Sequence, residues 1–207
     1  MAAPTKTIQT ELLAITAVAA NAQQLSSVLN VSTIFQATIF VDHARDTSDL
    51  AAMVGNGTEY RVQISQKATG NDTWVDISGG TVESAITASA SIVMDAQETA
   101  GATQIETGAT LPVVGDLVFF QNATLANSEW GRVVSRVTTG GSESFTLQDG
   151  LTNTQAAITV SNYAARWALV LDVLSYTRLR VVVNNNKGTT NKPINCRIAA
   201  ITMDTLS

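Results

Sequence analysis

Apolar and polar residues alternate through much of the chain, most clearly in residues 58–78. The alternating apolar positions there are Tyr60, Val62 and Ile64. A period of two is what a strand with one buried and one solvated face requires. A turn cluster at 68–72 follows, with Gly70 able to take positive φ, and a second extended run begins at Trp74. The segment therefore predicts a β-hairpin of the kind that builds antiparallel sandwiches.

Residues 33–45 predict a second strong strand, in which both faces carry apolar side chains. Such a strand is covered on both sides, or has one face that meets a partner. Further alternating or apolar runs predict strands within 81–94, 113–120, 129–137, 144–147, 163–173, 177–183 and 193–205.

Residues 12–29 are rich in alanine and leave two interpretations open. A helix is possible, but Thr and Val are mediocre helix formers and Asn21 interrupts the run. We favour an extended arm followed by a strand. Such an arm could pack on a neighbouring subunit instead of on its own core.

The order of these runs predicts an all-β protein. Residues 1–31 would form the N-terminal arm and first strand, and residues 32–95 and 164–207 a discontinuous antiparallel β-sandwich. A stretch poor in large apolar residues, at 95–108, marks a boundary. Residues 96–163 would form a small inserted β-barrel-like subdomain of four to five short strands.

The composition narrows the class of function. Only 14% of the 207 residues are charged, against a typical value of about 25%. So weakly charged a surface suits a protein that lies against other proteins, and would be a solubility liability for a free monomer. The net charge of −5 leaves no basic stripe for nucleic-acid phosphates, so we expect no nucleic-acid partner.

The cysteine content and the N-terminus predict the cellular compartment in which the chain is made. The single cysteine, Cys196, excludes an internal disulfide framework and lies in an apolar run typical of a buried free thiol. The N-terminus lacks the layout of a signal peptide, and no apolar run reaches the ~20 residues needed to span a bilayer. We expect synthesis in a cytoplasm and no membrane partner.

One cluster could carry chemistry. His43 is the only histidine, and Asp42, Asp46 and Asp49 lie near it. The set could form an acid–base pair or a hard-cation site. Its spacing lacks the alternating ligands and central glycine of a calcium loop, and a single histidine excludes a His-rich zinc site. Acidic residues in a turn are more often solvated or capping groups.

Other catalytic patterns are weak or missing. The serines at 78 and 142 lack the Gly-x-Ser-x-Gly elbow, and the sequence contains neither a P-loop nor a dinucleotide fingerprint. Glu98 and Glu106 could pair as glycosidase carboxylates, but they lie where nothing suggests a cleft. We therefore predict no catalytic, cofactor-binding or metal-binding residues, and no cofactor.

The three tryptophans, Trp74, Trp130 and Trp167, could serve as a sugar platform or as core residues. All three lie in strand-like patterns, which favours core packing.

Several segments support a resemblance to a known class. Residues 57–75 and 177–185 are similar to immunoglobulin-like capsid decoration, or cement, proteins of tailed bacteriophages, and 114–120 with 129–135 is similar to small β-barrels of phage head and tail proteins. Tyr176, before an alternating strand, resembles the tyrosine corner of immunoglobulin-like sandwiches. The resemblance implies an immunoglobulin-like sandwich that binds the major capsid protein at the capsid surface, commonly as a homotrimer. It implies no functional residue.

Two classes of function remain open. The first is a non-enzymatic virion structural protein, either a capsid decoration protein or a tail, neck or fibre-base protein. The second is a carbohydrate-binding module for host recognition. Ligand-dependent quenching of an exposed tryptophan would distinguish the second from the first.

Overall fold

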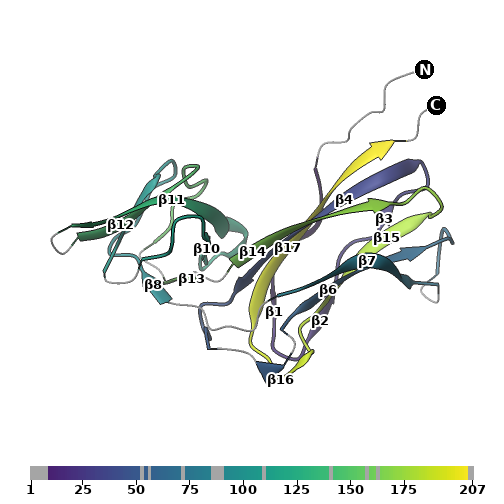
Figure 1. Ribbon diagram of the computed structural model, residues 1–207, viewed down its shortest axis with the longest axis horizontal. Coiled ribbons are helices and arrows are strands. Elements are labelled where there is room, and N and C mark those ends of the chain that lie inside the picture. The colour runs from purple at the N-terminus through teal and green to yellow at the C-terminus, as the bar shows by residue number, and fades with distance from the viewer. Residues whose placement is uncertain are drawn as a thin grey trace.

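The computed structural model describes residues 9–51, 54–55, 57–70, 73–84, 91–108, 111–139, 142–156, 159–161 and 164–204. Over these residues the regular secondary structure is β-strand, apart from one short 3-10 helix, η1 (Leu125–Asn127). Figure 1 shows two bodies, a larger sandwich and a smaller β unit. The predicted all-β antiparallel sandwich with an inserted β unit is confirmed.

One layer of the sandwich is a four-stranded antiparallel sheet. Its order is β1 (Thr10–Val18), β17 (Ile194–Asp204), β4 (Ile34–Arg45) and β14 (Ala164–Asp172). The predicted strand at 33–45 is therefore an inner strand, as its two apolar faces indicated. Alternation turns Ala37, Ile39 and Val41 inward, where they are fully buried.

The second layer is a five-stranded antiparallel sheet. Its order is β2 (Gln23–Leu25), β15 (Arg178–Asn184), β6 (Glu59–Ser65) and β7 (Val75–Glu83), and β3 (Leu29–Asn30) also pairs with β15. Strands β6 and β7 form the predicted hairpin. A small additional sheet joins β5 (Val54–Gly55) to β16 (Gly188–Thr190).

The strands pair in a nested pattern. If β2 and β3 count as one interrupted strand, the sandwich has eight described strands, and the first pairs with the eighth, the second with the seventh, the third with the sixth and the fourth with the fifth. This is a long antiparallel ribbon rolled into two sheets, which is the double-sheet jelly roll. An immunoglobulin sandwich instead places its first and last strands in different sheets. The strand order thus distinguishes this sandwich from the immunoglobulin topology.

The inserted unit is a six-stranded sheet. Its order is β8 (Ser91–Val93), β13 (Thr159–Ser161), β10 (Leu117–Phe120), β11 (Glu129–Thr139), β12 (Ser142–Leu147) and β9 (Gln104–Thr107). The two end strands also approach each other, because Met94 forms a bridge with Thr107 and the Gly108 N–H donates to the Val93 carbonyl at 3.3 Å. The sheet therefore curls into a small barrel, which we call the barrel.

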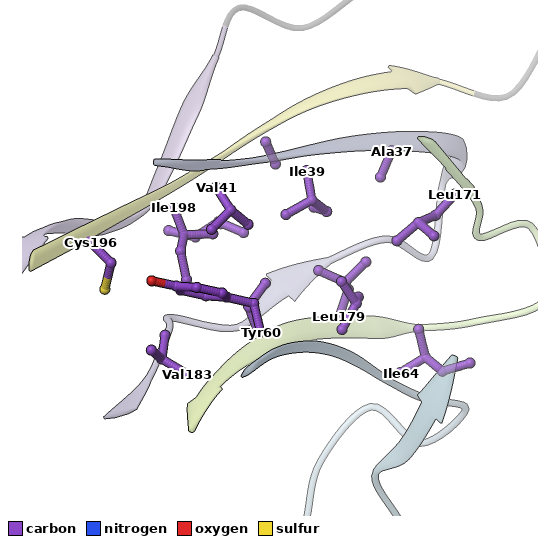
Figure 2. Packing of buried hydrophobic residues seen from close by; sticks show 14 of the residues in the cluster. Ala37, Ile39, Val41, Tyr60, Ile64, Leu171, Leu179, Val183, Cys196 and Ile198 are labelled. Carbon is purple, nitrogen blue, oxygen red and sulfur yellow. The ribbon is translucent and has the colours of Figure 1, made fainter. Parts of the chain in front are cut away.

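Each body has its own hydrophobic core. The sandwich core lies between its two sheets, where Figure 2 shows Ile39 and Val41 from one sheet facing Tyr60 and Leu179 from the other. The barrel core is built around Phe120, Phe145 and other apolar residues that are not part of the sandwich core. The proposed division of the chain into 1–31, 32–95 with 164–207, and 96–163 stays a prediction about domains, although the barrel sheet begins at Ser91.

The N-terminal region is extended where the structure describes it. Strands β1, β2 and β3 occupy most of residues 10–30, so the helical alternative for 12–29 is wrong. Asn21 takes positive φ, 63°, at the turn between β1 and β2. Strand β1 pairs with β17 of the same chain. Residues 1–8 of the predicted N-terminal arm and first strand, 1–31, lie outside the described residues.

Candidate functional site: the junction between sandwich and barrel

The main candidate site is a cavity of about 410 Å³ where the barrel meets the outer face of the four-stranded sheet, which we call the junction cleft. Residues from both bodies line it, including Glu129, Trp130, Arg132, Asp149, Arg166 and Arg197. Smaller cavities beside it share Arg197 with the cleft, so the concave surface continues onto the sheet.

A row of three charged residues crosses the sheet beside the cleft. Strand register places Arg166 of β14 and Arg197 of β17 directly opposite Asp42 of the central strand β4. Arg197 donates to Asp42 Oδ2 from Nε at 3.0 Å and from Nη2 at 2.5 Å. Arg166 Nε donates to Asp42 Oδ1. Two guanidinium groups therefore share one buried carboxylate, and the row carries a net charge of about +1.

Trp130 ties the barrel to this row. Its indole N–H donates to the backbone carbonyl of His43 at 3.2 Å, so a barrel side chain is bonded to β4. The Arg197 guanidinium lies 5.4 Å from the Trp130 ring centroid, within cation–π range, and Phe119 packs against the indole in a tilted arrangement with 4.5 Å between centroids.

A second set of polar contacts joins the bodies at Asp46. Gln121, which follows β10 of the barrel, donates to Asp46 Oδ2 at 2.8 Å and accepts from the Thr47 N–H at 2.8 Å. Asn195 of β17 donates to both Asp46 and Gln121. Burial raises the pKa of Asp46, but hydrogen bonds from Ser48, Gln121 and Asn195 outweigh this and hold the pKa below its usual range.

The wall of the cleft is polar and already bonded. Glu129 accepts hydrogen bonds from the backbone N–H groups of Thr152 and Asn153 and from the Gln155 side chain. Arg132 donates to the Gly115 carbonyl at 2.8 Å. These contacts hold the lining groups in place, so the cleft has a fixed polar wall.

The predicted cluster around His43 is divided between the two faces of β4. Asp42 faces outward into the arginine row, whereas His43 faces the core, so the two do not form an acid–base pair. Asp46 binds across to the barrel, and Asp49 pairs with Lys192 at 2.7 Å. Within the described part of the chain, no group of three or more His, Cys, Asp or Glu side chains could hold a metal ion.

His43 and Cys196 belong to a buried polar contact between the two sheets. His43 Nδ1 lies 2.6 Å from the Tyr60 hydroxyl, and His43 and Cys196 are directly paired on neighbouring strands. Figure 2 shows the Tyr60 oxygen and the Cys196 sulfur close together in the core. Burial, with the charge of Arg45, lowers the pKa of His43 to about 3, so the imidazole is neutral at physiological pH.

Only one tryptophan fulfils the prediction of a core position. Trp167 packs on the sandwich core near His43 and Tyr60. The prediction is wrong for Trp130, which lines the cleft, and for Trp74, which lies half-buried against two arginines outside both cores. Strand-like patterning does not tell the inner face from the outer face, and stacking on guanidinium groups covers an aromatic ring as a core does.

Sequence reasoning missed Arg166 and Arg197. Each looked like an ordinary polar position on an alternating strand. The available signal was that both occupy outward positions of strands that flank the strand of Asp42, but this requires the pairing order of β14, β4 and β17. Glu98 and Glu106, considered as a carboxylate pair, lie on the barrel outside the junction cleft.

Comparison with known proteins gives only distant likenesses. No protein-family model and no curated protein matches the sequence. Among solved structures, the chain is similar to the SPBc2 prophage-derived protein YomS, with 10% identity, TM-score 0.34, and 99% of this chain and 97% of that chain covered. It is also similar to VP17, a capsid protein of bacteriophage P23-77, with 8% identity, TM-score 0.22, and coverage of 99% and 100%. A structure of infectious bursal disease virus, Gx strain, matches with 6% identity, TM-score 0.25, and coverage of 97% and 41%. At these TM-scores the likenesses carry no argument about function.

No helix in the described residues is long and apolar enough to cross a membrane.

Proposed function

We propose that the chain is a non-enzymatic structural protein of a viral particle, and specifically a capsid decoration protein that bridges major capsid protein subunits at the capsid surface. The observation that carries the proposal is a pair of apolar rows on the outside of the four-stranded sheet, beside the charged row of Asp42. Double-sheet jelly rolls serve as viral capsid and lectin domains, and this fold-level analogy supports the same class.

The outer face of the four-stranded sheet has two adjacent apolar rows. Register aligns Ala168, Phe40 and Ala199 in one row across β14, β4 and β17. The next row, further from the charged row of Asp42, contains Val170, Thr38 and Ile201. Across β14, β4 and β17 neither row contains a charged residue, and Glu11 of the edge strand β1, which pairs with Ala199, borders the first row. Val170 is 61% exposed, so apolar surface faces solvent on this side.

Such a surface gains free energy when a partner covers it, at about 25 cal/mol per Å² of apolar area removed from water. A stable protein contact needs about 800 Å² on each partner, and several copies on one particle add avidity without new chemistry. Decoration would therefore work by surface burial repeated over the shell, with the homotrimer as the proposed form of the bound protein.

The test is cosedimentation of the purified chain with capsids of the encoding phage that lack this protein. We expect saturable binding of the wild type and a solution mass of three 21.8-kDa chains. Val170→Glu places a charge on the apolar rows and should abolish binding. Val134→Glu, on the exposed side of the barrel strand β11, is the matched control and should bind as the wild type does. A chain that stays monomeric and never sediments with capsids contradicts the proposal.

Location on the particle separates a decoration protein from a tail, neck or fibre-base protein. Electron microscopy of particles carrying the labelled chain should show label distributed over the shell. Label confined to one vertex or to the tail would favour the tail, neck or fibre-base assignment.

A second candidate, a carbohydrate-binding module, is favoured by one observation. Trp130 lines the junction cleft beside Arg166 and Arg197, where a sugar could contact the indole edge and the guanidinium groups. Titration with a glycan panel should quench tryptophan fluorescence in the wild type but not in Trp130→Phe. Unchanged fluorescence with every glycan removes this candidate.

A further inference from the structure

The junction cleft presents guanidinium nitrogens that the folded chain leaves unused. Arg166 binds Asp42 through Nε alone, so its two Nη atoms form no hydrogen bond with another described residue. Arg197 binds Asp42 through Nε and Nη2, which leaves its Nη1. Both arginines line the cleft. A guanidinium whose position is fixed and whose terminal N–H groups are free presents the fork that binds a carboxylate bidentately.

Strand register places both walls of the cleft around the same space. Arg166 and Arg197 lie on the outer face of the four-stranded sheet. On β11, Trp130 and Arg132 lie on the opposite side from Val133, which belongs to the barrel core, so they point out of the barrel. The 5.4 Å contact between Arg197 and the Trp130 ring joins the two walls. The guanidinium groups and the indole therefore border one cavity.

A carboxylate without a partner lines the same cleft. Three donors already saturate the other lining carboxylate, Glu129. The Asp149 carboxylate, in contrast, accepts no hydrogen bond and forms no ion pair within the described part of the chain, and the residue is exposed. Together with Asp42, these two acids balance the three lining arginines in formal charge, so the cleft is not a general trap for anions. It offers separate groups for a carboxylate and for hydrogen-bond donors.

The size and the lining of the cleft suit a small polar molecule. Its volume of about 410 Å³ falls within the range of about 300–1,000 Å³ that small-molecule sites occupy. The wall is already held by hydrogen bonds, so little side-chain freedom is lost when a ligand binds. The polar side chains of the lining belong to Glu129, Arg132, Gln148, Asp149, Thr152, Arg166 and Arg197.

We infer that the junction cleft binds a sugar that carries a carboxylate, of the hexuronic acid class. The carboxylate accepts hydrogen bonds from the Nη atoms of Arg166, beside Arg197. Hydroxyl groups of the ring donate to Asp149, and the ring lies against the edge of Trp130. A neutral sugar would leave the Arg166 fork unused, and a carboxylate without hydroxyl groups would leave Asp149 without a donor. The inference rests on the carbohydrate-binding candidate and deepens it, because it names the class of sugar and the residues that select it.

The experiment titrates the full chain with the methyl glycosides of glucuronic and galacturonic acid. Each is compared with its neutral counterpart, the methyl glycoside of glucose or galactose, in which a hydroxymethyl group replaces the carboxylate. Binding is measured by tryptophan fluorescence. We expect at least one uronide to bind about three- to tenfold more tightly than its counterpart, the gain of one exposed bidentate contact. This advantage should shrink as salt is raised.

Arg166→Gln removes the free fork and leaves Arg197 bound to Asp42. It should abolish the advantage of the uronide and leave binding of the neutral glycoside unchanged. Arg136→Gln is the matched control, because it makes the same charge change at an exposed position on β11 outside the cleft. The control should keep the advantage, and the thermal midpoint of each variant confirms folding. Equal affinity of the wild type for uronide and neutral glycoside, or equal losses in the two variants, would overturn the inference.

Two further results separate the possible failures. Glutarate, a dicarboxylate without hydroxyl groups, should bind more weakly than the uronide, and equal binding would overturn the assignment to a sugar. Neutral glycosides that quench through Trp130, with no preference for the uronides, would leave the carbohydrate-binding candidate standing while this inference falls. If no glycoside binds, both fall. Capsid cosedimentation is unaffected by any of these results.

Discussion

The indole N–H of Trp130 donates a hydrogen bond to the backbone carbonyl of His43 at 3.2 Å, and this bond joins the barrel to the central strand of the sandwich. The same indole lies 5.4 Å from the guanidinium carbon of Arg197. The barrel is therefore attached by side-chain contacts as well as by the two chain connections, and the orientation of the junction cleft depends on this residue.

Replacing Trp130 by Phe tests this attachment. The ring can still stack on Phe119, but the hydrogen bond is lost and the cation–π contact is weakened. We expect the free energy of unfolding to fall by about 1–2 kcal/mol, measured by urea denaturation. Trp74→Phe is the control, because the Trp74 indole nitrogen has no hydrogen-bond partner among the described residues. Equal losses in the two variants would show that the bond to His43 contributes nothing.

The carboxylate of Asp42 is expected to be a major electrostatic contributor to the junction. Asp42→Asn leaves Arg166 and Arg197 facing each other without a negative charge, on a residue that is only 3% exposed. We expect a loss of about 2–4 kcal/mol in the free energy of unfolding. Asp76→Asn removes a carboxylate from an exposed pair with Arg61 and should cost about 1 kcal/mol or less. The ranking would be refuted by a larger loss in Asp76→Asn.

The strands could be predicted because alternation is a local property. The spacing of Tyr60, Val62 and Ile64 indicates an inward face whichever strand pairs with theirs. All three are buried in the structure. Pairing order is not local. Strand β17 lies between β1 and β4, and nothing in the alternation of any of them indicates this neighbour. For this reason the sandwich could be predicted, whereas the rolled ribbon could not.

The junction cleft could not be predicted either, because it too depends on the pairing order of the strands. Arg166 and Arg197 belong to strands at different places in the chain, and only strand register brings both to Asp42. A related case is Asn185, in the polar run at 184–188, where nothing in the sequence indicates burial. It is fully buried, where its amide donates to the carbonyls of Val18, Ala19 and Lys192. Polar residues are tolerated inside when all their hydrogen bonds are made, and the sequence does not show those partners.

His43 predicts a loss of stability in mild acid. Its pKa is about 3 in the folded chain, mainly because of burial, and 6.5 ordinarily. Between these values the unfolded chain binds a proton that the folded chain does not. The free energy of unfolding should therefore fall as the pH drops below 6.5, by roughly 1 kcal/mol per pH unit, and should show no such slope above 6.5.

His43→Gln should flatten this slope between pH 6 and pH 4, as measured by urea denaturation at each pH. Asp46 does not obscure the window, because its lowered pKa makes its contribution disappear only as the pH falls below its ordinary value of 3.8. A slope that is the same in the variant and the wild type would assign the acid sensitivity to other groups.

The rate at which the Cys196 thiol is labelled measures how often the sandwich opens to solvent. Burial raises the pKa of its thiol to about 12, from an ordinary value of 9.0, and the Tyr60 hydroxyl only partly opposes this. Because the thiolate is the reactive form, the raised pKa predicts labelling at pH 8 by an aromatic disulfide reagent that is much slower than in the unfolded chain. Exclusion of the reagent from the core slows the reaction further.

Ser27→Cys in a Cys196→Ser background provides an exposed thiol that should react at once. If native Cys196 reacts as fast as this control, the space between the two sheets is open to solvent and the packing of Tyr60 against Cys196 is not maintained in solution.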